Sequence, residues 1–285
     1  MVERKTAAVG VGICSVLAMA AGAALYRRER SIAVSQLEIK AVVTAPLRVV
    51  HLSDLHGRVF GKGNQRLLSK ILSCGPDLIV VTGNLVGANP SDREIRQNVS
   101  LLRGLSDYAP VFFVCGGQEH QLKDLQAFLG TLRRSGVTVL QNEMVSLQVG
   151  EQQVTVLGLE EYPESSDLHG LLRDFELQDG FRLLLCSAPD GFSHNGQESY
   201  QNFYFDLMLS GRGQRRESSF SFQRGEGLRF QRRQQTYGEM PKLVVSRGLS
   251  NGRTLLSRFH RSEIVCVFVA PAEEQQLSAV PSQML

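Results

Sequence analysis

Short apolar runs alternate with amphipathic stretches along the chain from residue 47 onward. Apolar runs of four to eight residues are typical of buried strands, whereas apolar residues three and four positions apart indicate helices. Residues 64–73 show the helical spacing. So does the stretch after Ser91, where Ser91 followed by Glu94 forms a capping-box pattern. A further helix is expected to end at Gly136, and Gly150 is expected to turn a hairpin.

The predicted strands are distributed unevenly among the helices. Strand and helix alternate in the first half, and the second half is rich in strands, which indicates a layered α/β domain. In such domains the loops that leave the carboxyl ends of the strands usually carry the site. The strands are predicted at residues 47–52, 78–82, 111–115, 137–140, 144–149, 154–157, 182–186, 206–209, 243–246 and 264–269.

The N-terminus contains an uncharged apolar stretch, residues 7–26, about as long as a bilayer core requires. Its length favours an uncleaved single-pass membrane anchor; the alternative is a cleaved signal peptide. Basic residues on both sides give the positive-inside rule little asymmetry with which to set the orientation. These basic residues are Arg4 and Lys5 before the stretch and Arg27, Arg28 and Arg30 after it.

Composition narrows the choice of partners only slightly. The formal net charge of +3 implies no strongly charged partner for the whole chain. The five cysteines lack metal-like spacing, so we interpret them as small core residues rather than ligands or disulfides. Residues 211–240 hold seven arginines and fit no strand or helix period. This segment is either a solvated loop or a basic anion-binding loop, without a specific nucleic-acid signal.

A carboxylate and an imidazole follow the first predicted strand of the domain. Asp54 and His56 are two residues apart in a loop closed by Gly57, so both can face one divalent metal ion. Such a triplet is common by chance, and the surrounding sequence gives it weight. His51, inside the strand run, is expected to be a core side chain, and Glu119 a loop or cap residue.

Several sequence runs occur in an order that resembles the calcineurin-like metallophosphoesterases, specifically their bacterial membrane-associated branch. The resemblance covers residues 47–270. It implies a four-layer α/β/β/α sandwich with two metal ions at the strand ends, where the ions bind a phosphate ester and activate a water molecule. The runs are SDLHG, FGKGNQRLL, PDLIVVTGNLV, APVFFVCGGQE, GVTVLQNE, LLLCSAPD, DLMLSG and LVVSRGLSNG.

The resemblance implies a ligand set that this sequence keeps only in part. Asp54 and His56 match the family's first motif. Asn84 stands where the family has the aspartate that bridges both metals, and Gly87 replaces a second acid. A neutral amide cannot compensate the charge of two cations as a bridging carboxylate does.

The other motifs lack their expected ligands. Gly117 stands in place of the asparagine ligand, and Gln118 in place of the histidine used beside the leaving group. His120, two residues further on, is an alternative to that histidine if the loop shifts. Ser187 and Arg212 stand where metal-binding histidines are expected.

We therefore expect no cofactor, or at most one weakly held divalent ion of the Mn, Fe or Zn type on Asp54, His56 and Asn84. The arginines that enter near the lost histidines, Arg212, Arg215 and Arg216, form a candidate anion site because guanidinium groups bind phosphate in a bidentate manner. The predicted function is a catalytically degenerate, membrane-tethered pseudo-phosphoesterase that binds a phosphate-bearing ligand or partner. The alternative is a weak or single-metal phosphoesterase, so whether the chain is an enzyme stays open.

The predicted organisation has four parts. An anchor over residues 1–30 is followed by a linker with a short strand over residues 31–46. The phosphoesterase domain spans residues 47–270, with the basic insertion at 211–240, and residues 271–285 form a tail. The family resemblance favours the extracytoplasmic face of the membrane, and no protein partner is indicated.

Overall fold

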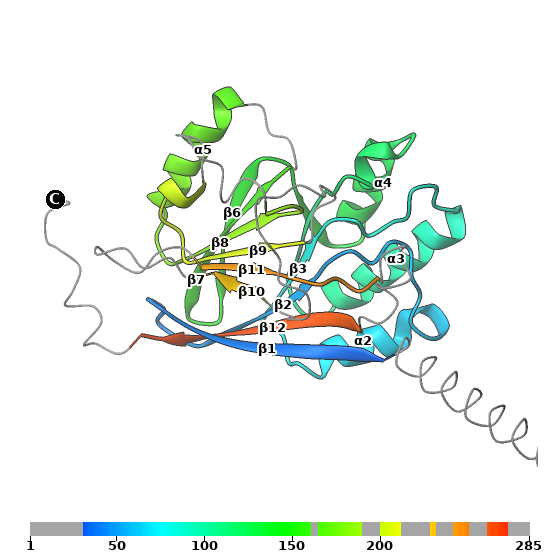
Figure 1. The fold of residues 1–285 in the computed structure, drawn as a ribbon, viewed down its shortest axis with the longest axis horizontal. Coiled ribbons are helices and arrows are strands. Elements are labelled where there is room, and N and C mark those ends of the chain that lie inside the picture. The colour runs from blue at the N-terminus through cyan, green and yellow to red at the C-terminus, as the bar shows by residue number, and fades with distance from the viewer. Residues whose placement is uncertain are drawn as a thin grey trace, which may run out of the picture.

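The computed structural model describes residues 31–160, 165–189, 200–211, 229–231, 242–250 and 261–272 (Figure 1). The predicted anchor, residues 1–30, lies outside these ranges. Among the residues that the structure describes, no helix is both long enough and apolar enough to cross a membrane.

Two six-stranded sheets form the body of the molecule. In the first sheet, β2 to β5 run parallel to one another, while β12 runs antiparallel to β2 and parallel to the edge strand β1. The segment expected to be a linker with a short strand thus contributes the ten-residue strand β1. The order in this sheet is β1 (Ile32–Ala41), β12 (Ser262–Pro271), β2 (Leu47–Leu52), β3 (Leu78–Thr82), β4 (Val111–Val114) and β5 (Val137–Leu140).

The second sheet is also mixed. Its strands β7, β8, β9 and β11 are parallel, and the antiparallel strands β6 and β10 lie at its two edges. The predicted hairpin around Gly150 is confirmed as the β6–β7 pair. The order is β10 (Arg229–Gln231), β11 (Lys242–Val245), β9 (Leu207–Ser210), β8 (Phe181–Cys186), β7 (Gln152–Leu159) and β6 (Glu143–Val149).

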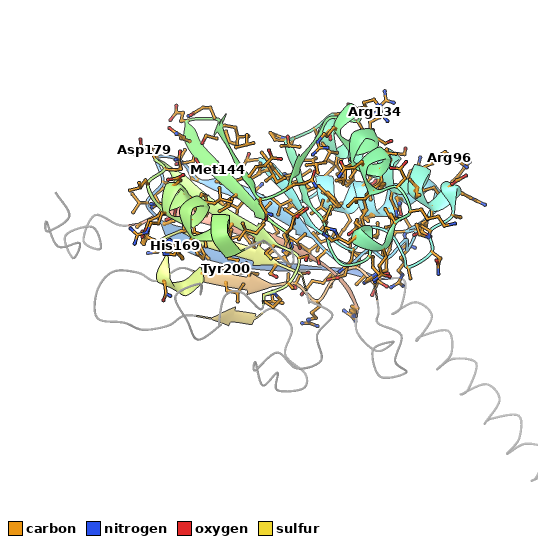
Figure 2. All side chains as sticks on the ribbon, turned by 90° about the horizontal axis from the view of Figure 1, so that it is seen from above. Arg96, Arg134, Met144, His169, Asp179 and Tyr200 are labelled. Carbon is orange, nitrogen blue, oxygen red and sulfur yellow. The ribbon has the colours of Figure 1, made fainter. Side chains whose placement is uncertain are left out.

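Helices cover the outer face of each sheet. Helices α2 (Gln65–Leu72), α3 (Asp92–Ser106) and α4 (Leu125–Arg134) pack on the first sheet, and α5 (Ser165–Glu176) packs on the second. Figure 2 shows this division, with Arg96 and Arg134 on the helices of the first sheet and Met144 and His169 on the side of the second. Short 3-10 turns are found at Lys62–Asn64, Glu119–Gln121 and Tyr200–Asn202.

Alternating strand residues build three apolar layers. In β2, Val49 packs between the two sheets, whereas Val50 packs under the helices of the first sheet. This alternation follows from the two-residue period of a strand. Together the layers confirm the α/β fold expected from the sequence, with both sheets in the middle and helices outside.

Two local predictions need correction. Ser91 does begin α3, because its side chain accepts a hydrogen bond from the Glu94 amide at 3.3 Å. The Glu94 carboxylate, however, accepts from the Gly87 amide at 2.8 Å, so it braces the preceding loop instead of completing a capping box. Helix α5 was not predicted, although Leu168, Leu172 and Phe175 have helical spacing and are buried.

Candidate functional site

The loops that follow β2 and β3 run side by side at the carboxyl ends of these strands. The backbone amides of Asp54, His56 and Gly57 donate to the carbonyls of Gly83, Asn84 and Leu85 at 3.2, 2.8 and 3.0 Å. Parallel neighbouring strands bring these loops to one edge of the sheet, and the backbone bonds keep them in register. Asp54, His56 and Asn84, the three candidate metal ligands, are thereby brought together.

These three residues share an unusual backbone conformation. Asp54, His56 and Asn84 have φ values of +53°, +46° and +53°, in the left-handed region that non-glycine residues seldom adopt. Such a conformation persists only where the surrounding structure enforces it, and it is common at functional sites. The local backbone of the first two motifs is therefore held in a specific, enforced shape.

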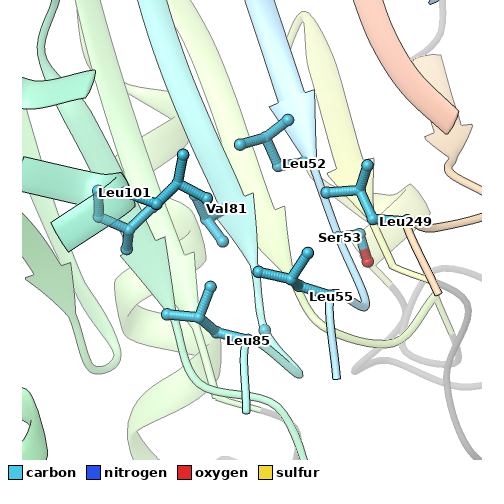
Figure 3. Close-up of a pocket in the computed structure, with 9 residues that line it drawn as sticks. Leu52, Ser53, Leu55, Val81, Leu85, Leu101 and Leu249 are labelled. Carbon is cyan, nitrogen blue, oxygen red and sulfur yellow. The ribbon is translucent and has the colours of Figure 1, made fainter. Parts of the chain in front are cut away.

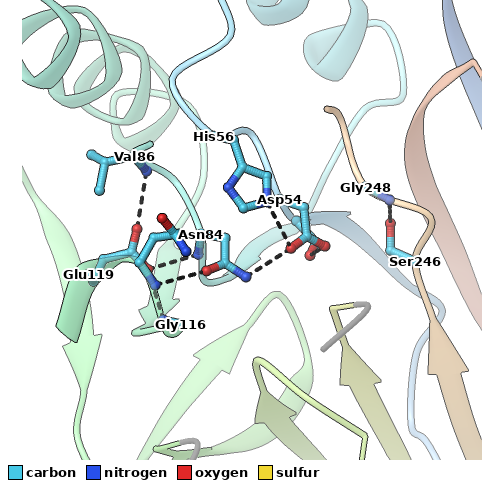
Figure 4. A network of polar contacts seen from close by, with 10 residues as sticks. Asp54, His56, Asn84, Val86, Gly116, Glu119, Ser246 and Gly248 are labelled. Atoms are coloured by element: carbon cyan, nitrogen blue, oxygen red, sulfur yellow. Dashed lines mark hydrogen bonds and ion pairs between the residues drawn. The ribbon is translucent and has the colours of Figure 1, made fainter. Parts of the chain in front are cut away.

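The side-chain amide of Asn84 joins two loops. Its Nδ2 donates to Asp54 Oδ1 at 2.9 Å, and its Oδ1 accepts from the Gln118 backbone amide at 3.1 Å (Figure 4). Because a backbone N–H can donate only to the amide oxygen, the hydrogen bond from Gln118 determines which end of the amide faces Asp54. The end that faces Asp54 is a hydrogen-bond donor.

Asp54 is enclosed on several sides and is 7% exposed. Ser53 Oγ donates to its Oδ2 at 2.5 Å, and His56 Nε2 lies 3.7 Å from its Oδ1. The His56 side chain is 34% exposed, so it forms the open side of the site. Gly248 backs Asp54 closely, since a Cβ there would lie 2.7 Å from Asp54 Cβ.

Glu119 is the buried acid that supports these loops. Its Oε2 accepts from the amides of Asn84 and Gly116 at 2.8 Å each, and its Oε1 accepts from Val86 at 3.1 Å. Burial raises the pKa of Glu119 to about 7, although the three backbone donors favour the ionised form. The expectation of a loop or cap residue understated its role, because two of its three partners lie more than thirty residues away and leave no local sequence signal.

The positions where the family resemblance led us to expect further ligands come after three different strands. Gly117 and Gln118 are partly buried in the loop after β4, and His120 is exposed in the 3-10 turn Glu119–Gln121. Ser187, after β8, is 1% exposed. Arg212, Arg215 and Arg216 lie outside the described residues.

Gly211, the last described residue before the arginines, packs directly against the other sheet. A Cβ at this position would lie 2.5 Å from Ser53 Oγ, 2.7 Å from the Ser187 carbonyl and 3.1 Å from the Thr82 carbonyl. The ends of β8 and β9 therefore meet the ends of β2 and β3 through small side chains and backbone atoms.

The donor set at this edge does not fit a two-metal centre. Asp54 supplies one carboxylate and His56 one imidazole, while Asn84 presents an N–H group toward Asp54 and uses its oxygen for Gln118. Catalytic metals in proteins are usually held by three or more protein ligands. Within the described part of the chain, no three His, Cys, Asp or Glu side chains gather closely enough to hold an ion.

An apolar pocket lies under the loops (Figure 3). Ser53 is the only polar side chain in its lining, so it offers no place for a charged phosphate group. We interpret it as incomplete packing below the site. The residues that line it are Leu52, Ser53, Leu55, Val81, Gly83, Leu85, Leu101, Leu102 and Leu249.

Sequence comparisons match part of the chain to a known family. Residues 47–174 match the family model described as calcineurin-like phosphoesterase. The metallophosphoesterase YkoQ of Bacillus subtilis is 25% identical over 168 residues, which are 58% of this chain and 60% of that protein. The metallophosphoesterase Cj0846 of Campylobacter jejuni is 28% identical over 234 residues, which are 77% of this chain and 58% of that protein. The chain thus spans about three fifths of each relative's length.

The solved structures that the comparison matches share little sequence with the chain. The TT1561 protein of Thermus thermophilus is 15% identical with a TM-score of 0.47, covering 73% of this chain and 92% of that one. The purple acid phosphatase PPD1 from yellow lupin is 13% identical with a TM-score of 0.46, covering 85% and 57%. The match over residues 47–174 and the two metallophosphoesterase relatives support the assignment of this region to the calcineurin-like phosphoesterase family.

Proposed function

We propose that this chain is a pseudo-phosphoesterase, a membrane-tethered member of the family that binds a phosphate-bearing ligand or partner without two-metal hydrolysis. The main support for this proposal is the hydrogen bond from Asn84 Nδ2 to Asp54 Oδ1 at 2.9 Å. The atom nearest to this Asp54 oxygen from the second motif is a hydrogen-bond donor, where a metal centre would need an oxygen ligand.

The phosphate-binding part of the proposal is supported by the sequence. Arg212, Arg215 and Arg216 follow Gly211, which lies against Ser53 and Ser187 at the strand ends. Guanidinium groups are permanently charged and match phosphate oxygens in pairs. Arginine would then supply the positive charge that metal ions supply in an active phosphoesterase, and residues 1–30 would hold the domain at a membrane.

The second candidate is a weak phosphoesterase that uses one metal ion. It is favoured by the partly exposed His56 ring, 3.7 Å from the Asp54 carboxylate, because these two groups alone could hold an ion loosely. With only two protein ligands, such an ion would be weakly held.

Metal content and turnover distinguish the two candidates. The full-length chain would be loaded with Mn²⁺, desalted and analysed for bound metal, and its hydrolysis of a generic phosphodiester would be measured. We expect well under one ion per chain, and no turnover that depends on Asp54. The matched variants are Asp54→Ala and, as a control, the exposed Asp179→Ala. Stoichiometric metal with turnover lost only in Asp54→Ala would establish the enzyme instead.

Ligand binding needs a separate measurement. Inorganic phosphate and a phosphodiester would be titrated while the melting temperature of the full-length chain is followed. We expect the ligand to raise the melting temperature, and this rise to shrink in Arg212→Ala. An unchanged melting temperature, with Arg212→Ala equal to the parent, would remove phosphate binding from the proposal.

A further inference from the structure

The contacts of Asn84 lead to an inference that rests on the proposed function and extends it. We propose that the Asn84 amide takes the place of a bound cation between the strand-end loops, so that the chain holds a latent metal position which one carboxylate would restore. The site would then be stable without a bound metal ion.

The charge of the Asp54 carboxylate must be compensated inside the protein. A carboxylate that is only 7% exposed needs hydrogen-bond donors or a cation to offset the loss of water. Here Asn84 Nδ2 serves Oδ1 and Ser53 Oγ serves Oδ2, at 2.9 and 2.5 Å. Neutral donors from the chain itself thus satisfy both carboxylate oxygens.

The Asn84 side-chain amide has one favourable orientation. Rotating the Asn84 amide by half a turn would place its oxygen against the Asp54 carboxylate and its NH₂ group against the Gln118 N–H. Both contacts would then be repulsive, so the observed orientation is strongly preferred. Asn84 is also held at its backbone by Glu119, and it lies so close to Gly116 that a Cβ added there would be 2.8 Å from Asn84 Oδ1.

Replacing the Asn84 amide by a carboxylate would change the site. In an Asn84→Asp variant, an oxygen would replace the nitrogen that now lies 2.9 Å from Asp54 Oδ1. Two carboxylates at this distance repel each other unless a proton or a cation lies between them. Together with His56, they would supply three ligands of the types that Mn²⁺ and Zn²⁺ accept. Folding would then be coupled to metal binding.

Thermal unfolding of the full-length chain tests this coupling. The melting temperature would be measured in EDTA and in Mn²⁺ for the parent and for Asn84→Asp. We expect the parent to melt at the same temperature in both. We expect Asn84→Asp to melt several degrees lower than the parent in EDTA and to regain several degrees in Mn²⁺, because a ligand that binds only the folded state stabilises it.

Two further variants separate the metal effect from general damage. Asn84→Ala removes the amide without adding a carboxylate, so it should melt below the parent in both buffers and ignore Mn²⁺. Asn142→Asp places the same change at another left-handed residue, φ +56°, whose side-chain oxygen accepts from the Glu160 amide at 2.9 Å. It should also ignore Mn²⁺.

Different results would contradict the proposed function and the latent metal position. If Mn²⁺ raises the melting temperature of the parent, both the proposed function and this inference fail. If Mn²⁺ changes the melting temperature of neither the parent nor Asn84→Asp, only the inference fails. The same holds if Asn84→Ala is as stable as the parent. If a variant is already unfolded in EDTA, circular dichroism would measure whether it refolds in each buffer. Recovery of Asn84→Asp by Mn²⁺ supports the latent site, and failure to refold in either buffer counts against it.

Discussion

The two sheets contribute to the site in opposite ways. The loops after β2, β3 and β4 of the first sheet carry polar side chains, among them Asp54, Asn84 and Glu119, that bond to one another or to the backbone of a neighbouring loop. The ends of β8 and β9 in the second sheet offer Ser187 and Gly211, and they meet the first sheet mainly through backbone atoms.

The difference shows that side-chain hydrogen bonds join the loops of the first sheet, whereas close backbone packing shapes the strand ends of the second. The polar groups of the first sheet bond to one another across the loops after β2, β3 and β4. At Gly211 the second sheet packs so closely on the first that a Cβ would not fit without a shift. Each of the following experiments tests one side of this contrast.

The largest effect is expected from Glu119→Ala. The substitution leaves the amides of Asn84, Val86 and Gly116 without their acceptor, and each buried unsatisfied donor costs about 1–3 kcal/mol. We expect the free energy of unfolding, measured by urea denaturation, to fall by about 3 kcal/mol or more.

The second sheet supplies the matched control. Asp206 accepts hydrogen bonds from the Arg182 backbone amide and side chain at 2.8 and 3.3 Å, away from the strand-end loops. Asp206→Ala should therefore cost less than Glu119→Ala. An equal or greater cost for Asp206→Ala would show that the first sheet's loops are not the more strongly bonded region.

A smaller effect is expected from Gly211→Ala. Its new Cβ would approach Ser53 Oγ and the Ser187 carbonyl to 2.5 and 2.7 Å, which requires the two sheets to separate locally. Overpacking of this kind costs about 2 kcal/mol, and thermal or urea unfolding would measure it.

The control for Gly211 is Gly170 in α5. A Cβ there meets nothing within 4 Å, so Gly170→Ala should stabilise the helix by up to about 1 kcal/mol. If Gly211→Ala were as well tolerated as Gly170→Ala, the strand ends would not be in the tight contact that the comparison assumes.

A pH-dependent effect is expected from His51, which lies under the site. Burial lowers the pKa of His51 to about 3, and its Nε2 lies 2.7 Å from Thr82 Oγ1. Between about pH 6.5 and pH 3 the unfolded chain binds a proton at His51 that the folded chain does not. Stability should therefore fall as the pH drops through this window, by about 1.4 kcal/mol per unit from this residue, and His51 should contribute no slope above it.

Urea denaturation at several pH values would measure this slope in the parent and in His51→Gln. The variant should lose the part of the slope that His51 contributes, and the exposed His120→Gln should keep it. A parent and a His51→Gln variant with identical pH profiles would show that His51 takes up protons equally in both states.

The sequence alone predicted much of the framework. Apolar periodicity located most strands of both sheets and the helices of the first, because burial on one or two faces imposes a period on the chain. It also placed Asp54 and His56 together after β2. The interpretation of Asn84, Gly117 and Ser187 as replaced ligands stays a prediction. These inferences concern residues that are adjacent in sequence or aligned with a motif.

Only the tertiary structure decided how the residues of the site are bonded to one another. The Asn84 amide takes its orientation from Gln118, and Glu119 acquires its role from backbone amides in two loops. Gly211 is constrained by Ser53, on the other sheet. Hydrogen bonds and close contacts of this kind act at about 3 Å between segments far apart in sequence, so their presence depends on how the strands are arranged in space.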